Sequence, residues 1–139
     1  MVLVVAAAIA ALRPAPAEAA RLTKAEARLL MVVNHARQNH GMRRLHVGRR
    51  LQPAAHDWAV HLRRHNAFYH GRLRSGTSEN VGWLTCRKGW AGTLVRMWLR
   101  SSSHRPHLLD RGARYVGVGV ASGQWSGYNC VRIGVTRFR

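Results

Sequence analysis

Two stretches near the C-terminal end decide the fold class: residues 115–120, YVGVGV, and residues 130–138, CVRIGVTRF. Both alternate with a period of two, which is typical of β-strands whose side chains point to opposite faces. The Gly- and Ser-rich segment 122–127 lies between them, so we predict an antiparallel pair of strands joined through that segment. Gly117 and Gly119 share one face and predict that another element packs closely there.

Three segments upstream of the strands carry apolar residues at helical spacing: about 23–40, about 51–66 and about 90–100. In the first, Thr23 is followed three residues later by Glu26, the pattern of a capping box, and Gly41 follows the last turn. Helices that precede strands predict an α+β domain, with helices packed on a small antiparallel sheet. Segment 68–83 is rich in Gly and Ser and is predicted to be a loop, with one short turn at most.

The length of 139 residues fits one domain with a core of its own. Residues 1–12 form an uncharged apolar run, shorter than the roughly 20 residues that span a bilayer, so we predict no transmembrane helix. Ala17-Glu18-Ala19 has the form of a cleavage site, which predicts a signal peptide over residues 1–19, a mature domain over residues 20–139 and a secreted protein. No basic residue precedes the apolar run, so either the true start lies upstream of Met1 or the segment stays as an anchor.

Two cysteines, Cys86 and Cys130, fit an exported protein with one disulfide. Such a bond would stabilise the fold by about 4 kcal/mol in the chain-entropy model. Two unrelated buried thiols are the alternative. A zinc site built from this pair alone is disfavoured, because the chain has no Cys-x-x-Cys motif.

The formal charge of +18 predicts attraction to polyanions such as nucleic acid, anionic lipid or acidic cell-wall polymers. The basic residues are 21 Arg and 2 Lys, scattered along the chain rather than gathered in one stripe. No nucleic-acid motif accompanies them, so we predict no specific nucleic-acid partner. A genome-wide bias towards arginine is the alternative origin of the charge. Salt-dependent attraction to anionic surfaces follows under either origin.

A candidate site centres on the stretch 97–109, MWLRSSSHRPHLL, in which a predicted helix ends at a serine cluster. His104 follows at once, so its side chain lies at the end of an element, where it can face a cleft. With His70 and Glu79, it gives a candidate set of two histidines and one carboxylate in a chain that has five acidic residues. The pair His61 and His65, four residues apart, lacks the glutamate of His-Glu-x-x-His and is interpreted as two exposed histidines.

Five pieces of sequence, in this order, resemble those of one family: residues 30–37 (LMVVNHAR), 68–70 (FYH), 79–82 (ENVG), 98–109 and 116–120. The chain is similar to bacterial members of the CAP superfamily, which includes cysteine-rich secretory proteins, insect antigen 5 and plant pathogenesis-related 1 proteins. The resemblance implies a single-domain α-β-α sandwich with a surface cleft. In the family, two histidines and two acidic residues line that cleft and can hold a divalent ion such as zinc.

Carried over, the resemblance assigns the histidines to His70 and His104 and the first acid to Glu79. The position of the second acid falls at Ser101, which cannot act as a carboxylate ligand. Three interpretations stay open: a hydrogen-bonded cluster in which Glu79 orients one imidazole and Ser101 or Ser102 bonds the other, a weak zinc site, and a catalytic site.

Two further residues are predicted at the rim of the cleft together with Ser101. Arg105 offers a bidentate clamp for a carboxylate or phosphate, with a helix-terminal ion pair as the alternative. Asn80 is expected to fix loop backbone rather than contact a ligand.

The predicted function is a non-enzymatic extracellular binding module for a lipid, a sterol-like molecule or an anionic envelope polymer. A metal-assisted hydrolase that uses His70, Glu79 and His104 is the alternative from another class. Nucleic-acid binding through charge alone is the third hypothesis.

Overall fold

Four strands form one mixed sheet in the computed structural model, which describes residues 21–139. The strands are β1 (His46–Val47), β2 (Ser78–Thr85), β3 (Tyr115–Trp125) and β4 (Tyr128–Phe138). Their order across the sheet is β1-β3-β4-β2; β1 pairs with β3 in parallel, and the other two pairs are antiparallel. The predicted signal peptide lies outside the described residues.

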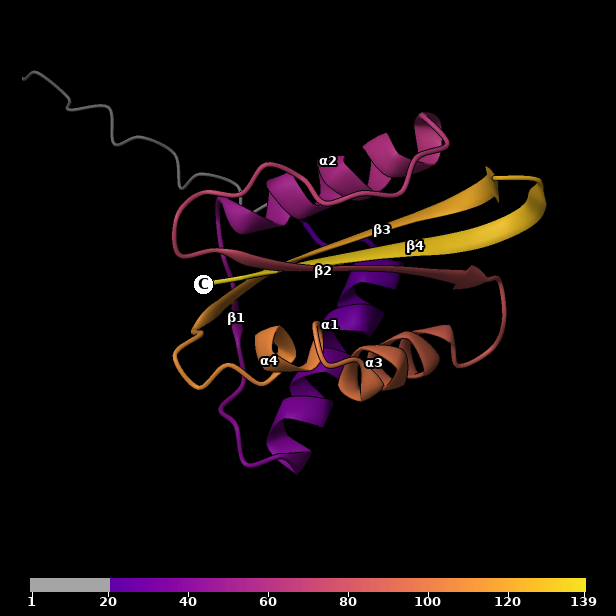
Figure 1. The fold of residues 1–139 in the computed structure, drawn as a ribbon. Helices are drawn as coiled ribbons and strands as arrows, with labels where there is room; N and C mark the ends of the chain where they lie inside the picture. Colours follow the sequence, from indigo (N-terminus) through magenta and orange to yellow (C-terminus); the bar gives the residue numbers. More distant parts are fainter. Residues whose placement is uncertain (1–20) are drawn as a thin grey trace, which may run out of the picture.

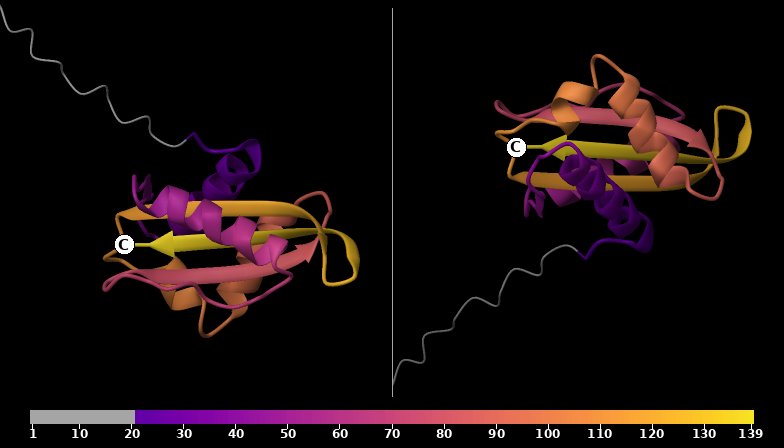
Figure 2. Two further views of the ribbon diagram at one scale, coloured as in Figure 1. Left: turned by 90° about the horizontal axis from the view of Figure 1, so that it is seen from above. Right: turned by 90° about the horizontal axis from the view of Figure 1, so that it is seen from below.

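Helices cover both faces of this sheet, as Figure 1 shows. They are α1 (Lys24–Asn39), α2 (Leu51–Arg64), α3 (Trp90–Arg100) and the short α4 (Arg105–Leu108). The helix α2 lies alone on one face, and α1, α3 and α4 lie on the other, as the two views of Figure 2 also show. The predicted α-β-α sandwich is therefore confirmed, with a mixed sheet in place of the purely antiparallel one.

The core consists of two apolar clusters, one on each face of the sheet. The larger packs α1, α3 and α4 against the sheet and is centred on Leu29, Leu94 and Trp98. The smaller packs α2 through Ala55, Ala59 and Leu62. Among the described helices, none is long and apolar enough to cross a membrane.

The face of β3 that carries Gly117 and Gly119 packs directly on the backbone of α2. A Cβ at Gly117 would collide with the carbonyl of Leu51, and one at Gly119 would collide with the carbonyl of Ala55. Four residues of helix advance about 6 Å, and two residues of strand advance about 7 Å. The two glycines therefore meet successive turns of a helix that runs along the strand, which confirms the predicted close packing.

The buried side chain of Gln52 completes the contact between α2 and β3. Its amide nitrogen donates to the Val118 carbonyl at 2.8 Å, and its carbonyl oxygen accepts from the Val118 amide at 2.9 Å. β1 pairs with β3 only at residues 115 and 116. At Val118, beyond that pairing, Gln52 makes the two hydrogen bonds that a neighbouring strand would otherwise make. A buried strand edge is thereby hydrogen-bonded.

The ends of α1 follow the predicted pattern. Thr23 and Glu26 form a reciprocal capping box, with the Thr23 amide donating to the Glu26 carboxylate at 2.8 Å. The helix is followed by Gly41 at φ 71°, a left-handed conformation that glycine adopts at low cost.

Two predictions about the strands are wrong. The segment 68–83 is a loop only in its first part, because β2 begins at Ser78. The connection between the last two strands is also shorter than segment 122–127, because β3 extends to Trp125 and the turn is Ser126-Gly127. Both turn residues have positive φ, 47° and 82°, which is typical of a two-residue hairpin turn that matches the strand twist.

A disulfide joins Cys86, just after β2, to Cys130 in β4, which confirms the predicted pairing. The bond closes a loop with a sequence separation of 44 residues. It fixes the end of β2 beside the hairpin of β3 and β4.

Replacing Gly119 by alanine tests the packing of α2 on β3. We expect Gly119→Ala to lower the free energy of unfolding by about 1–3 kcal/mol, because the added methyl group forces the helix away from the strand. Urea unfolding followed by circular dichroism measures this change.

The matched control is Gly92→Ala in α3, where the nearest atom is the flexible end of Arg96, 3.3 Å away. That variant gains helix propensity and is expected to be neutral or up to about 1 kcal/mol more stable. Equal stability of the two variants would contradict the assigned packing.

Candidate functional site

The carboxylate of Glu79 is fully buried, and both of its oxygens accept hydrogen bonds from protein groups. Oε2 accepts from Arg137 Nε at 2.8 Å, and Arg137 is the residue directly opposite on β4. Oε1 accepts from the Gly71 amide at 3.0 Å and from His70 Nδ1 at 2.9 Å. Glu79 therefore orients the imidazole of His70 and leaves Nε2 of that ring facing outward, since the side chain of His70 is 60% exposed.

His104 lies in the connection between α3 and α4, directly before the first residue of α4. Its Nδ1 is 2.7 Å from the Ser101 hydroxyl, and the more distant Ser103 hydroxyl is at 3.4 Å. Burial is the largest cause that lowers the pKa of His104 from its ordinary value; the nearby imidazoles of His70 and His107 lower it further. The two predicted histidines thus lie close enough to repel each other when protonated.

Asn80 holds the His104 segment in place from β2. Its side chain is fully buried, its amide donates to the His104 carbonyl at 3.0 Å, and its carbonyl oxygen is 3.0 Å from His107 Nδ1. Arg105 donates to the Leu99 carbonyl at 3.2 Å, and no carboxylate of the described residues pairs with it. His107 was not among the predicted site residues; its position three residues after His104 was the available signal.

The three residues His70, Glu79 and His104 do not converge as one ligand set. Among residues 21–139, no group of three or more His, Cys, Asp or Glu side chains has the arrangement of a metal site. The chemical reason is that both carboxylate oxygens of Glu79 already accept hydrogen bonds, from a guanidinium, a backbone amide and an imidazole. The hydrogen bonds are those of the polar-cluster interpretation, and both histidines keep one ring nitrogen without a partner among the described residues.

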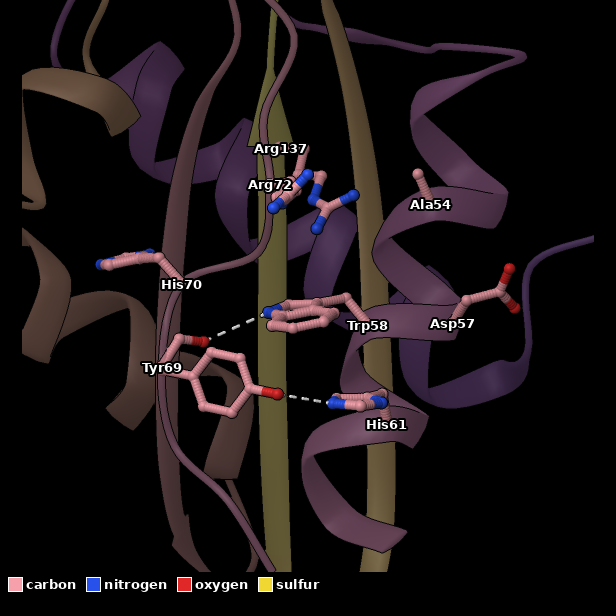
Figure 3. Close-up of a pocket in the computed structure, with 8 residues that line it drawn as sticks. All are labelled: Ala54, Asp57, Trp58, His61, Tyr69, His70, Arg72 and Arg137. Atoms are coloured by element: carbon pink, nitrogen blue, oxygen red, sulfur yellow. Dashed lines mark hydrogen bonds between the residues drawn. The ribbon is translucent and has the colours of Figure 1, made fainter. Parts of the chain in front are cut away.

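A pocket of about 650 Å³ lies between α2 and the loop that follows it, and Arg137 is one of the residues that line it (Figure 3). Trp58 donates to the Tyr69 carbonyl at 3.2 Å, and the Tyr69 hydroxyl is 2.7 Å from His61 Nε2. His70 also lines this pocket, but Figure 3 shows its imidazole directed away from Trp58. His61 stacks between the rings of Trp58 and His65, at 4.7 and 4.2 Å between centroids.

A second, larger hollow of about 780 Å³ adjoins this pocket and shares Ala54, Arg72 and Arg137 with it. We call it the arginine groove, because six arginines line it: Arg49, Arg50, Arg72, Arg74, Arg137 and Arg139. The sequence alone did not predict this groove. Its arginines belong to three short Arg-Arg or Arg-x-Arg motifs, but no local pattern in the sequence indicates that these motifs meet in space.

We call His70, His104 and His107 the histidine cluster. The lowered pKa of His104 gives a test of the coupling within this cluster. As the pH falls through the unfolded-state value near 6.5, the unfolded chain takes up the proton first, so the free energy of unfolding is expected to fall until the pH reaches the lower folded-state pKa of His104, and the loss persists below that pH. Above that range the ring is neutral in both states and the effect is absent. In an NMR titration, His70→Gln is expected to raise the pKa of His104, because one nearby positive charge is removed. The control is His35→Gln, at an exposed position on α1. An unchanged His104 pKa in the first variant would contradict the coupling.

Comparisons with solved structures agree with the fold. The chain is similar to an outer surface protein from Borrelia burgdorferi, with 17% identity, a TM-score of 0.60, and coverage of 85% of this chain and 94% of the other. It is also similar to BmVAL-1, with 17% identity, a TM-score of 0.62, and coverage of 85% and 78%. A cysteine-rich secretory protein, SAV1118 from Staphylococcus aureus, matches with 19% identity and a TM-score of 0.54, over 82% of this chain and 38% of its own.

Comparison with curated protein sequences gave no match. The model of the cysteine-rich secretory protein family, CAP, matches residues 30–133, which is most of the described domain. That span contains all four residues of the polar cluster: His70, Glu79, Ser101 and His104. The chain therefore belongs to the CAP, or cysteine-rich secretory protein, family.

Proposed function

We propose that this chain is a non-enzymatic extracellular binding domain for anionic components of a cell envelope, either lipids or polymers. The observation that carries the proposal is the nearly complete absence of negative charge from the described surface. Arg13 and Glu18 lie outside residues 21–139, which leaves 22 of the 23 basic residues and four of the five acidic ones.

Two of those four carboxylates do not contribute to the surface. Glu26 and Glu79 are buried, at 1% and 2% exposure, and Asp57 and Asp110 are the exposed acidic side chains of the described part. Acidic side chains therefore do little to offset the charge of the arginines. Such a field attracts polyanions over a distance of about one Debye length, roughly 10 Å at 0.1 M salt.

The arrangement of the histidine cluster favours binding over hydrolysis. A metal-assisted hydrolase needs a ligand set with an open position for water. Here Glu79 is engaged with three protein donors, and the family resemblance assigns the position of the second acid to Ser101, which cannot supply a carboxylate. No observation specific to this chain supports the hydrolase alternative. The disulfide between Cys86 and Cys130 supports export to an oxidising compartment.

The histidine cluster supports a more modest proposal for metal binding. The Nδ1 atoms of His70 and His104 are hydrogen-bonded, which fixes the rings and leaves the Nε2 lone pairs free to coordinate a metal. Hydrogen bonding of the second ring nitrogen is the usual support of a metal-ligating imidazole. We propose that these two atoms take up zinc weakly, with Glu79 and Ser101 as positioning residues.

Vesicle binding tests the proposed function. We expect the purified protein to sediment with vesicles that contain anionic phospholipid, and not with phosphatidylcholine alone. The bound fraction should fall by at least about tenfold between about 50 mM and about 500 mM salt, because exposed charges are screened.

A teichoic-type polymer replaces the vesicles in a second arm, and a sterol in neutral vesicles tests the uncharged alternative. Absence of retention on every anionic surface at low salt would overturn the proposal. Equal competition by heparin and nucleic acid would mark nucleic-acid binding as non-specific.

Zinc titration tests the two-histidine site. We expect zinc at a concentration well above Kd to raise the Tm of the wild-type protein by a few degrees, because the ion binds the folded state. His104→Ala should abolish the shift, and His35→Ala, at an exposed position outside the cluster, should retain it. A shift that persists in His104→Ala would contradict the proposed ligands.

A further inference from the structure

We propose that the arginine groove binds a single-chain anionic amphiphile, with a phosphate or carboxylate head group at the arginines and its hydrocarbon chain on the apolar wall. The proposal rests on the proposed function and names the site and the chemical class of its ligand.

The groove lies at one end of the sandwich, where five elements meet. Its walls are β1 with the following turn, the first turn of α2, the loop of residues 72–77, the start of β3 and the C-terminal end of β4. Figure 1 shows β1, the start of α2 and the C-terminal end of β4 at this same end of the molecule. His104 does not line the groove.

Most of the positive charge in this groove has no carboxylate partner among the described residues. No Asp or Glu of residues 21–139 lines the groove. Of its six arginines, Arg137 has a carboxylate partner, Glu79, and the other five have no ion pair within the same residues. Gathering like charges is unfavourable, and an anionic ligand with several acceptor oxygens relieves the repulsion.

Arg137 is a fixed donor where the groove joins the neighbouring pocket. Its residue is 8% exposed, its Nε donates to Glu79, and its guanidinium lies 5.9 Å from the centroid of the Trp58 ring. Because Nε is occupied, the terminal nitrogens of the same group remain as donors. Arg72 lines both hollows as well, so two guanidinium groups lie at this junction. A buried carboxylate thus preorganises one arginine for a head group.

Part of the groove wall is apolar and exposed to solvent. Three large apolar or aromatic side chains that line it remain exposed: Val47 at 37%, Leu73 at 39% and Tyr115 at 50%. Leu51 and Pro53 extend this apolar wall along the first turn of α2. A small inorganic anion would leave these side chains in water, and an uncharged lipid would leave the arginines unpaired.

The size of the groove favours one small amphiphile over a flat membrane contact. Its volume of about 780 Å³ falls within the range of about 300–1,000 Å³ found for small-molecule sites. A flat surface that docks on a bilayer does not need such a hollow. The groove therefore combines a charged part and an apolar wall, and its volume suits one acyl chain and its head group.

Binding of lauroyl lysophosphatidic acid below its micelle concentration tests the proposal by calorimetry. Inorganic phosphate supplies the same head-group chemistry without a chain, and lauroyl lysophosphatidylcholine supplies the same chain without net charge. We expect the wild-type protein to bind the first at least about tenfold more tightly than either of the others, because only the first satisfies both parts of the groove.

Two matched pairs of variants locate the site. Arg49→Ala/Arg74→Ala removes two exposed groove arginines and is expected to weaken binding about tenfold or more. Arg96→Ala/Arg100→Ala removes the same charge from the exposed face of α3 and is expected to have an effect under about threefold. Leu73→Ser should weaken binding of the amphiphile and leave phosphate binding unchanged, whereas Met97→Ser on α3 should alter neither.

Four results would overturn the proposal. Phosphate binding as tight as amphiphile binding would leave a simple anion site. Equal losses in the groove and α3 double variants would show diffuse electrostatic attraction, which contradicts the groove while the proposed function stands. Absence of amphiphile binding in a protein that still binds anionic vesicles would contradict the groove alone; absence of binding to every anionic surface would overturn the proposed function as well.

Discussion

The buried ion pair between Glu79 and Arg137 is the interaction on which both candidate sites depend. The two residues are directly opposite on neighbouring antiparallel strands, and the carboxylate also binds His70 and the Gly71 amide. A buried carboxylate is tolerated because each of its oxygens has a donor. Removing one partner would leave a buried charge unpaired, at a cost of about 3–5 kcal/mol.

This one pair orients groups in both candidate sites. Through Oε1 it fixes the ring of His70 beside His104, and through Oε2 it holds the guanidinium of Arg137 at the junction of the pocket and the arginine groove. Glu79 acts as a positioning residue in both places. In a chain with so few acidic residues, one of them is thus used to preorganise positively charged or imidazole groups rather than to contact a ligand.

The sequence predicted the elements whose pattern is local. The capping box at Thr23 and Glu26 and the alternation in the last strands need no distant partner, so those predictions are confirmed. β2 was missed because it begins with Ser78, Glu79 and Asn80. The latter two are buried polar residues, and a polar run predicts a loop unless the residues that bond them are known.

The histidines, the acid and the serine of the polar cluster were identified from motifs, and their hydrogen bonding was one of three interpretations left open; which histidine takes which partner was not predicted. Ser101 bonds His104 within one local turn, three residues apart, whereas Glu79 in β2 bonds His70 in the loop that follows α2. Separate motifs fix the identity of such residues. Their distances depend on how the elements pack.

The sequence by itself determined the helices, the terminal hairpin, the excess of positive charge and the presence of two cysteines, since each is a property of composition or of spacing within one segment. Only the tertiary structure decided where that charge gathers. Arg49, Arg74 and Arg139 belong to segments far apart in the chain, and they meet because β1 pairs with β3 and α2 packs on glycines that carry no side chain to keep it away. Convergence of this kind depends on long-range contacts, which leave no periodic signal in the sequence.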